Sequence, residues 1–350
     1  MTDPFIPQQK LFWHLDRLFQ ILHDGHTIAP ITVEFYPTYK CNLGCKFCDF
    51  AHVNKKNKDM SLPKELGDKI IEQLSEAGVR GINWSGGGEP TLHPDLPHWA
   101  ELISETGMTQ GIFTNGLLMN EGLIKTFLEH MSWVRFSVNA GTPTAYANIH
   151  GTDKNVFHNV LKNIGKLVDM KKEGGHKTTI GVSMVANREN CLEVGGLGHI
   201  IDGLGVDYFQ VRPDSSMIPG IAQCVYEDMM NMLKADPISH RFLISKYKWA
   251  DVQKNNCDKY YDMCRAPWLI GVIGAEGKMW ICSEMVGREG MAIGDLNAET
   301  FRDIWERERL ANILKYITPS HCRNLCKDHE VNKLLYHIFK VDEGKHPNHI

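Results

Sequence analysis

Short β-rich runs alternate with helical runs between residues 31 and 211 of this 350-residue chain. The runs expected to form strands lie at 31–36, 81–85, 111–114, 133–138, 178–185 and 207–211. The helices expected between them lie at about 63–77, 95–106, 120–130, 155–171 and 191–203. Strands separated by helices form a parallel sheet, because each helix returns the chain to the edge where the next strand begins. We therefore predict an α/β fold, either an open sheet or an open barrel, with its functional site at the carboxyl ends of the strands.

The pattern changes after about residue 225, which indicates a second, smaller domain. A helical stretch at about 226–248 leads to two β-rich runs around Ala275–Lys278, where a Glu-Gly pair is typical of a hairpin turn. A further helix is expected at about 299–315. The predicted units are an N-terminal helical segment at 1–30, a core domain at 31–225, a smaller domain at 226–340 and a tail at 341–350.

The N-terminal segment contains one amphipathic helix, expected at 8–24. Its leucines recur at helical spacing, and they are Leu11, Leu15, Leu18 and Leu22. A stripe of this kind predicts a helix that packs this face against the protein.

Composition and charge exclude several classes of partner. The net charge of −4 favours neither nucleic acid nor an anionic membrane as the main partner. No run approaches the roughly 18 apolar residues of a transmembrane helix. The N-terminus also lacks the basic and apolar regions of a signal peptide. We expect a cytoplasmic protein that binds neither nucleic acid nor membrane.

The first cysteine group follows the first predicted strand in the spacing C-x3-C-x2-C, at Cys41, Cys45 and Cys48. In a reducing compartment, clustered cysteines more often bind metal than form disulfides. Three thiolates can hold one face of a [4Fe-4S] cluster and leave one iron open to another ligand. The alternative is a structural zinc site closed by a fourth ligand, for which His52 is the nearest candidate.

The second cysteine group lies in the smaller domain. Cys264 and Cys282 are spaced C-x12-G-x4-C around Gly277, and Cys322 and Cys326 follow forty residues later. A hairpin brings the first two thiols together, so four thiolates can reach one site. From spacing alone, that site suits either a closed zinc ion or a fully ligated iron–sulfur cluster.

The first group resembles the signature of the radical S-adenosylmethionine (SAM) superfamily, in which an aromatic residue precedes the third cysteine, as Phe47 does here. The resemblance implies that the open iron binds SAM, and that an electron from the cluster cleaves SAM to a 5′-deoxyadenosyl radical. A glycine-rich segment after the second predicted strand also resembles the family's GGE motif, whose backbone binds the SAM amino group. Its matching residues are Gly87, Gly88, Glu89 and Pro90. Taken alone, this segment would be read as a glycine-rich turn.

Polar residues at later strand ends are weaker matches to the SAM contacts of the family. They are Asn115, Ser137, Asn139, Ser183 and Arg212. The family often has an acid where Asn139 stands, so this position departs from the pattern. Arg212 is a candidate for a bidentate pair with the SAM carboxylate. Asp214 is a candidate base toward the substrate. We expect both to be catalytic residues. Turn caps and a surface ion pair are the structural alternatives for these residues.

The second group, followed by Gly294-Asp295-Leu296 and a helix, resembles the SPASM/Twitch extension of radical SAM enzymes. Full SPASM domains carry seven cysteines, whereas four are well placed here, which implies the Twitch-like version with one auxiliary [4Fe-4S] cluster. Cys257, just upstream, is a candidate spare ligand that such a cluster does not need. The resemblance as a whole implies a partial (β/α)6 radical SAM barrel with a smaller C-terminal auxiliary-cluster domain.

The implied activity is that of a radical SAM oxidoreductase that removes hydrogen from a small molecule. We expect oxidation or rearrangement of a sugar, cyclitol or nucleotide-sugar, with a flavodoxin or ferredoxin as reducing partner. The alternative is modification of a ribosomally made peptide by cross-linking or epimerisation. Only about 30 residues precede the first predicted strand, too few for the winged-helix peptide-binding domain of many such enzymes. A purely structural or electron-transfer protein would need neither the three-cysteine site nor the GGE segment.

Overall fold

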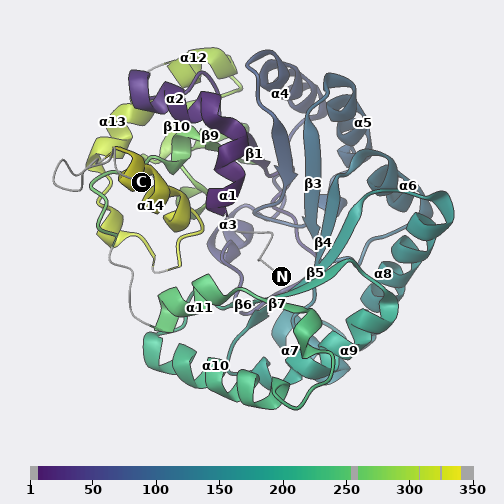
Figure 1. Cartoon of the computed structure of the whole chain (residues 1–350). Coiled ribbons are helices and arrows are strands. Elements are labelled where there is room, and N and C mark those ends of the chain that lie inside the picture. Colours follow the sequence, from purple (N-terminus) through teal and green to yellow (C-terminus); the bar gives the residue numbers. More distant parts are fainter. Residues whose placement is uncertain (1–6, 254–258, 307, 324, 340–350) are drawn as a thin grey trace.

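The computed structural model describes residues 7–253, 259–306, 308–323 and 325–339. The strands assigned in these ranges form one sheet, in the order β10-β9-β8-β1-β2-β3-β4-β5-β6-β7. In Figure 1 the sheet curves into an open ring with most helices on its outside.

The first six strands run parallel to one another. They are β1 (Thr32–Phe35), β2 (Gly81–Trp84), β3 (Thr109–Thr114), β4 (Trp133–Ser137), β5 (Thr179–Ala186) and β6 (Tyr208–Pro213). The helices between them are α3 (Ala51–Lys56), α4 (Lys64–Glu76), α5 (Leu96–Thr106), α6 (Glu121–His130), α7 (Pro143–His150), α8 (Asn155–Gly174) and α9 (Val194–Leu204). Every predicted strand and helix of the core is present, so the α/β fold with a parallel sheet is confirmed. Helices α3 and α7 are additions that the periodicity did not predict.

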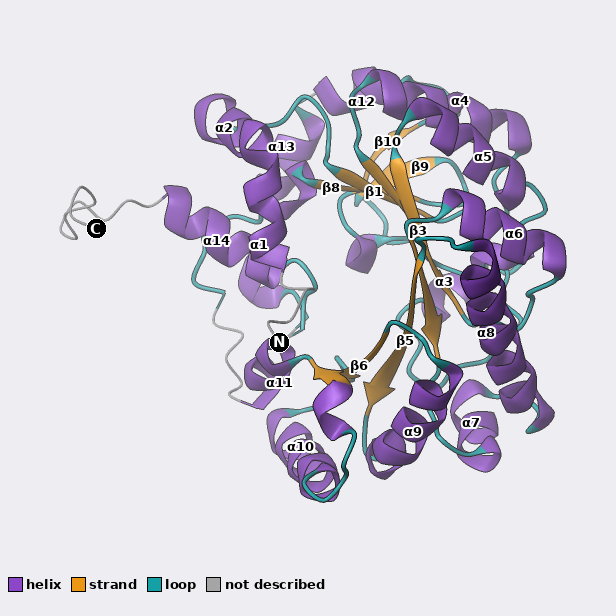
Figure 2. Cartoon of the chain, turned by 45° about the vertical axis from the view of Figure 1, so that its right-hand side comes forward, coloured by secondary structure: helices purple, strands orange, loops and turns teal. Residues whose placement is uncertain are grey.

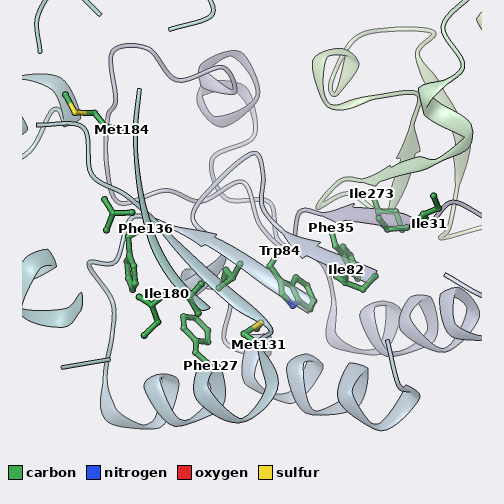
Figure 3. Close-up of a cluster of buried hydrophobic side chains, with 14 of the residues drawn as sticks. Ile31, Phe35, Ile82, Trp84, Phe127, Met131, Phe136, Ile180, Met184 and Ile273 are labelled. Atoms are coloured by element: carbon green, nitrogen blue, oxygen red, sulfur yellow. The ribbon is translucent and has the colours of Figure 1, made fainter. Parts of the chain in front are cut away.

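Alternate residues of the parallel strands point outward and pack beneath the helices. Phe35 of β1 and Trp84 of β2 are partners in register, and their rings stack with centroids 5.1 Å apart. Trp84 stacks in turn on Trp99 of α5 at 6.0 Å. Figure 3 shows Phe127 of α6 and Phe136 of β4 in the same layer. The main hydrophobic core therefore lies between the sheet and its outer helices.

The intervening residues point into the ring, where an arginine lies among aromatic side chains. The guanidinium of Arg135 on β4 lies 5.1 Å from the ring centroid of Phe113 and 5.6 Å from those of Trp133 and Tyr208. Its Nε donates to the Tyr208 hydroxyl at 2.8 Å. Because Trp133 and Tyr208 begin their strands, this cluster fills the end of the ring opposite the carboxyl ends of the strands.

The sheet continues on both sides of the six-stranded core. Strand β7 (Phe242–Ile244) pairs parallel to β6, and β8 (Ile270–Ile273) pairs parallel to β1. Strands β8 and β9 (Lys278–Trp280) form the hairpin predicted around Gly277, and β10 (Ala292–Asp295) adds to β9. The C-terminal segment thus extends the core sheet through β1, and the domain boundary near residue 225 stays a prediction.

One long helix expected from the sequence is broken in the structure, and a second is described only in two parts. The stretch expected at 226–248 consists of α10 (Pro219–Leu233), the strand β7 and α11 (Lys246–Gln253). The helix expected at 299–315 contains α12 (Phe301–Glu306) and α13 (Arg309–Tyr316), and position 307 between them lies outside the described residues. In the first case the apolar run at 242–244 gains backbone pairing as an edge strand on β6, and this tertiary contact outweighs local helical preference.

The expected helix at 8–24 is also interrupted, by a turn of 3-10 helix between α1 (Pro7–Leu11) and α2 (Leu15–Asp24). This break changes which face packs inward. Leu11 and Leu18 are buried together with Ile21, whereas Leu15 is 49% and Leu22 is 38% exposed. The prediction of a single leucine stripe packed against the protein was therefore wrong for Leu15 and Leu22.

The last described helix, α14 (His329–Phe339), lies beside α1 at the side of the ring where the C-terminal segment packs (Figure 2). The predicted tail at 341–350 and Cys257 lie outside the described residues. No helix in the described part of the chain has the length and apolar character to cross a membrane.

A matched pair of glycine substitutions tests the packing of the outer helices. A Cβ added to Gly67 in α4 would lie 2.2 Å from the Trp99 indole, whereas one added to Gly203 in α9 meets nothing within 4 Å. We expect Gly67→Ala to lower the free energy of unfolding by about 1–3 kcal/mol through overpacking. Gly203→Ala should leave it unchanged or raise it by up to about 1 kcal/mol. Urea denaturation of both variants checks this, and equal effects would contradict it.

Candidate functional site

Three thiols gather on the loop that leaves the carboxyl end of β1. Cys45 and Cys48 are partly buried, and Cys41 is more exposed. Burial, together with the neighbouring thiols Cys48 and Cys41, raises the pKa of Cys45 to about 12. Burial likewise raises the pKa of Cys41 and Cys48. Thiolates at these positions would need a nearby positive charge, which a bound metal group would supply.

Other features of this loop fit a metal group larger than one ion. The sulfurs of Cys41, Cys45 and Cys48 do not all lie within 4.8 Å of one another. A single zinc ion with bonds of about 2.3 Å would hold its sulfurs about 3.8 Å apart. His52, the nearest candidate for a fourth zinc ligand, instead directs Nε2 to the Val286 carbonyl at 3.1 Å. The spacing therefore favours an iron–sulfur cluster.

Three buried polar atoms near the cysteines lack a hydrogen-bond partner in the described part of the chain. They are Asn42 Nδ2, the Tyr146 hydroxyl and Asn54 Oδ1, whose side chain directs Nδ2 to the Cys48 sulfur at 3.9 Å. Burial raises the pKa of the Tyr146 hydroxyl, and the nearby Cys45 thiol adds to this rise. Unpaired buried polar groups are rare in folded proteins, so these atoms fit a site that receives a bound group.

The glycine segment after β2 packs directly against the start of the cysteine loop. The amide of Glu89 donates to the Lys40 carbonyl at 2.8 Å. A Cβ on Gly88 would lie 2.1 Å from that same carbonyl oxygen, and one on Gly87 would lie 2.1 Å from the Tyr39 ring. These positions need glycine because two loops of the protein contact each other here. The sequence had suggested only that their backbone binds SAM. Pro90 is buried and begins a short 3-10 turn.

The carboxylate of Glu89 is buried and joins the glycine segment to the end of β3. One oxygen accepts from the Thr91 amide at 3.1 Å and from the hydroxyls of Thr91 and Thr114 at 2.7 Å each. The other accepts from the Asn115 amide at 2.7 Å. Burial raises the pKa of Glu89, and these hydrogen bonds oppose the rise. The side chain is thus fully engaged by the protein, which leaves the backbone of the segment to face a ligand.

The remaining residues predicted at the strand ends divide into two groups. Asn115 lies beside the cysteine loop, where its Nδ2 donates to Asn42 Oδ1 at 2.7 Å. Ser137 and Ser183 are partners in register on β4 and β5. Asn139 is buried and turned into the protein, because its Oδ1 accepts from the Val185 amide at 2.8 Å.

At the end of β6, Asp214 and Arg212 lie further from the cysteine loop along the sheet. Asp214 is buried, and its carboxylate accepts from the amide and hydroxyl of Ser216 at 2.8 and 2.7 Å and from Asn187 at 3.4 Å. Arg212 is partly buried and pairs in register with Val185 of β5. The structure brings together the cysteine loop, the glycine segment and Asn115. The loop that begins with Asp214 also reaches the cysteine loop, because the Ser215 hydroxyl lies 3.5 Å from Asp49 Oδ1.

A helix that the sequence did not predict holds the cysteine loop from its other side. The carbonyls of Ile149 and His150, in the last turn of α7, accept from the amides of Lys46 and Gly44 at 3.0 and 2.8 Å. The ring of Phe47 lies edge-on to His150, with centroids 6.4 Å apart. The only sequence signal for this contact is a His-Gly pair after the fourth strand, which is not specific.

The second group of cysteines surrounds a cavity of about 300 Å³ in the C-terminal segment. All four thiols line it: Cys264, Cys282, Cys322 and Cys326. Burial raises the pKa of each, that of Cys326 to about 12. Asn332 of α14, which the sequence analysis missed, directs Nδ2 to the Cys264 sulfur at 3.2 Å. An enclosed space with four buried thiols fits a fully ligated cluster.

The two cysteine groups are joined through Arg323, the neighbour of Cys322. Its guanidinium binds the Glu284 carboxylate at 2.7 Å and that of Asp49, the neighbour of Cys48, at 2.8 Å. It also contacts the Ser215 hydroxyl in the loop after β6. The loops after β1 and β6 and the segment that follows Cys282 therefore meet at one side chain, which the sequence did not single out.

A second link crosses the same boundary deeper in the structure. Lys327, the neighbour of Cys326, binds Glu34 of β1 at 2.5 Å and lies 3.8 Å from Asp328. The other oxygen of Glu34 accepts from the Tyr36 hydroxyl at 2.9 Å. The strand that leads into the first cysteine loop is thus tied to the loop that carries the second group.

Removing one acceptor from the Glu89 carboxylate tests its role. Glu89→Gln replaces one oxygen with an amide group that cannot accept, so at least one buried donor loses its partner. We expect the free energy of unfolding to fall by about 1.5–3 kcal/mol. Glu101→Gln, an exposed residue of α5, is the matched control and should change it by less than about 0.5 kcal/mol. Chemical denaturation of both variants is the measurement, and equal stability would show that the carboxylate is not a structural link.

Comparison with known families matches two parts of the chain. Residues 35–190 match the model of the radical SAM superfamily, and residues 264–328 match the SPASM iron–sulfur cluster-binding domain. These ranges contain the two cysteine groups described above.

Individual relatives span much of the chain. One relative is the tungsten-containing aldehyde ferredoxin oxidoreductase cofactor-modifying protein of Pyrococcus furiosus. It is 27% identical to this chain over 312 residues, and the match covers 83% of this chain and 85% of the relative. The chain is 28% identical to the S-adenosylmethionine-dependent nucleotide dehydratase of Flammeovirga pacifica, covering 49% of this chain and 59% of that protein.

Among solved structures, Streptococcus suis SuiB bound to the precursor peptide SuiA has the same fold, with a TM-score of 0.67. The identity is 16%, and the match covers 89% of this chain and 72% of SuiB. The two family matches imply a SAM-binding [4Fe-4S] cluster and an auxiliary cluster, which the two groups of buried thiols fit. The chain therefore belongs to the radical SAM superfamily and carries a C-terminal SPASM iron–sulfur domain.

Proposed function

We propose that this enzyme removes a hydrogen atom from a small molecule of the sugar, cyclitol or nucleotide-sugar class, leading to its oxidation or rearrangement. The observation that carries the proposal is the junction at Arg323, which ties its own loop to the loops after Cys48 and β6 and to the segment after Cys282. Loops joined in this way favour an enclosed substrate space over an open groove for an extended peptide. The names of the two relatives also describe reactions on a cofactor and on a nucleotide.

We assign the first cluster to Cys41, Cys45 and Cys48. Three ligands leave one iron open for SAM. When bound, this group supplies the electron that cleaves SAM, and the resulting 5′-deoxyadenosyl radical takes hydrogen from the substrate. The backbone of Gly87, Gly88 and Glu89 orients SAM, while the Glu89 side chain holds that backbone in place.

Polar residues around the ring complete the proposed SAM contacts. Asn115 lies beside the cysteine loop, and Ser137 and Ser183 face the same side of the sheet. Asn139 contributes through its packing, since its side chain is turned toward Val185. Phe47 and Pro90 support the cysteine loop and the glycine segment.

Substrate chemistry is assigned to the end of β6. Asp214 is held by Ser216 and Asn187, which orient its carboxylate as a base for the proton lost on oxidation. Arg212 supplies a cationic partner for a carboxylate of SAM or of the substrate.

We assign the auxiliary cluster to Cys264, Cys282, Cys322 and Cys326. When bound, this group supplies an acceptor for the electron released by substrate oxidation, and a flavodoxin or ferredoxin is the proposed source of the first electron. Four protein ligands leave no open iron, which suits electron transfer and not substrate binding.

Metal analysis separates the two assignments. Anaerobically reconstituted wild type should hold about eight irons, and each set of cysteine-to-alanine variants should hold about four. The Cys41, Cys45 and Cys48 triple variant should lose reductive formation of 5′-deoxyadenosine from SAM. The variant at the four auxiliary cysteines should keep it, because the open-site cluster lies in the ring. A triple variant that still forms 5′-deoxyadenosine would refute the first assignment, and four irons plus one zinc in wild type would refute the second.

The substrate class is tested by what accelerates SAM cleavage. Wild type with SAM and reductant is incubated with the small-molecule fraction or with the peptide fraction of a cell extract, and 5′-deoxyadenosine is quantified. We expect stimulation by the small-molecule fraction, with loss of that stimulation in Asp214→Asn. Stimulation by the peptide fraction alone would replace the proposal with peptide modification.

A further inference from the structure

His150 is a buried histidine that reaches the first cysteine group from a distant part of the chain. It ends α7 and is 1% exposed, and its Nδ1 lies 3.1 Å from the sulfur of Cys45, 105 residues earlier. Its ring stacks on Tyr146, with centroids 4.1 Å apart. Stacking and burial leave the imidazole one orientation, with Nδ1 toward the sulfur and Nε2 toward Asn139.

The neighbouring hydrogen bonds decide which nitrogen of His150 carries the hydrogen. Asn139 Oδ1 accepts from the Val185 amide at 2.8 Å, which sets the orientation of that side-chain amide. Its Nδ2 therefore faces His150 Nε2, at 3.4 Å. An amide nitrogen only donates, so Nε2 must accept. In the neutral imidazole the hydrogen then lies on Nδ1, directed at the Cys45 sulfur.

The main chain of the same helix end fixes the position of Cys45. The two carbonyls that close α7 accept from the amides on either side of Cys45, those of Gly44 and Lys46. Gly151 follows with a φ of +60°, and a Cβ there would lie 2.8 Å from the Gly44 carbonyl oxygen. The cysteine is thus held by its own loop and by α7 together, so the Nδ1–H to sulfur contact is built into the fold.

We propose that His150 is a positioning residue for the SAM-binding cluster, donating a hydrogen bond from Nδ1 to the Cys45 thiolate and thereby making one-electron reduction of the cluster easier. Hydrogen bonds to the sulfurs are among the features that set cluster potentials. Reduction adds negative charge that the thiolates share, and a donor stabilises the more negative form. The inference rests on the proposed assignment of this cluster to Cys41, Cys45 and Cys48.

Two substitutions separate the hydrogen bond from the packing of the ring. His150→Phe keeps an aromatic ring against Tyr146 but removes the donor. His150→Asn loses the ring but keeps an N–H near the position of Nδ1. His158→Phe, at an exposed position on α8, is the matched control. The measurement is a redox titration of the reconstituted enzyme followed by electron paramagnetic resonance, using the signal that changes when SAM is added.

We expect His150→Phe to make the equilibrium constant for reduction at least tenfold less favourable, which is a potential lower by about 59 mV for a one-electron couple. His150→Asn should stay within about threefold of wild type, and His158→Phe should match wild type. An unchanged potential in His150→Phe would overturn the inference. An equal fall of the potential in His150→Asn would also overturn the inference, because it would show that the effect comes from loss of the ring and not from loss of the donor.

The remaining outcomes are also decisive. If His150→Phe retains no SAM-responsive cluster, retention of that cluster by His150→Asn supports the donor role, and loss from both variants refutes it. A separate measurement tests the assignment of the cluster on which this inference rests. A SAM-responsive signal that persists in the Cys41, Cys45 and Cys48 triple variant would refute that assignment. An unchanged potential in His150→Phe, with that signal absent from the triple variant, refutes only the role of His150.

Discussion

The buried carboxylate of Glu89 is the interaction on which the arrangement of the SAM site depends. Its two oxygens accept from donors on its own loop and at the end of β3, while its backbone amide binds the Lys40 carbonyl before the first cysteine. One residue thus joins two strand ends to the cysteine loop. Because the carboxylate is buried, a missing acceptor would leave a donor without a partner or water, which makes the junction specific as well as stabilising.

The second constraint is the continuity of the sheet through β1. That strand pairs with β2 on one side and with β8 of the C-terminal segment on the other. The loop that carries Cys41, Cys45 and Cys48 and the hairpin that leads to Cys282 therefore grow from adjacent strands. The contacts of Arg323 and Lys327 add charged links across the same boundary. A site supported by paired strands keeps its geometry better than one supported by loops alone.

Several residues identified as ligand contacts from sequence also serve the protein itself. Gly88 is glycine because the Lys40 carbonyl lies where a Cβ would be, and the Glu89 side chain is saturated by protein donors. Asn139, at a position where the family often has an acid, is turned toward Val185 and His150. The residue type at a motif position can thus be required by contacts within the protein that shape the loops around the cofactor.

Local pattern was enough to predict the α/β class, the six core strands and the two cysteine groups, because strand and helix periodicity and short cysteine spacings are written in consecutive residues. It was not enough for the broken helix at 226–248, where pairing of β7 with β6 overrides helical preference. The sequence also could not identify His150, Asn332 or Arg323 as neighbours of the cysteines. These residues lie 105, 68 and 274 positions from Cys45, Cys264 and Asp49. Only the folded sheet, which brings distant strand ends to one edge, decides which of the many polar side chains meet there.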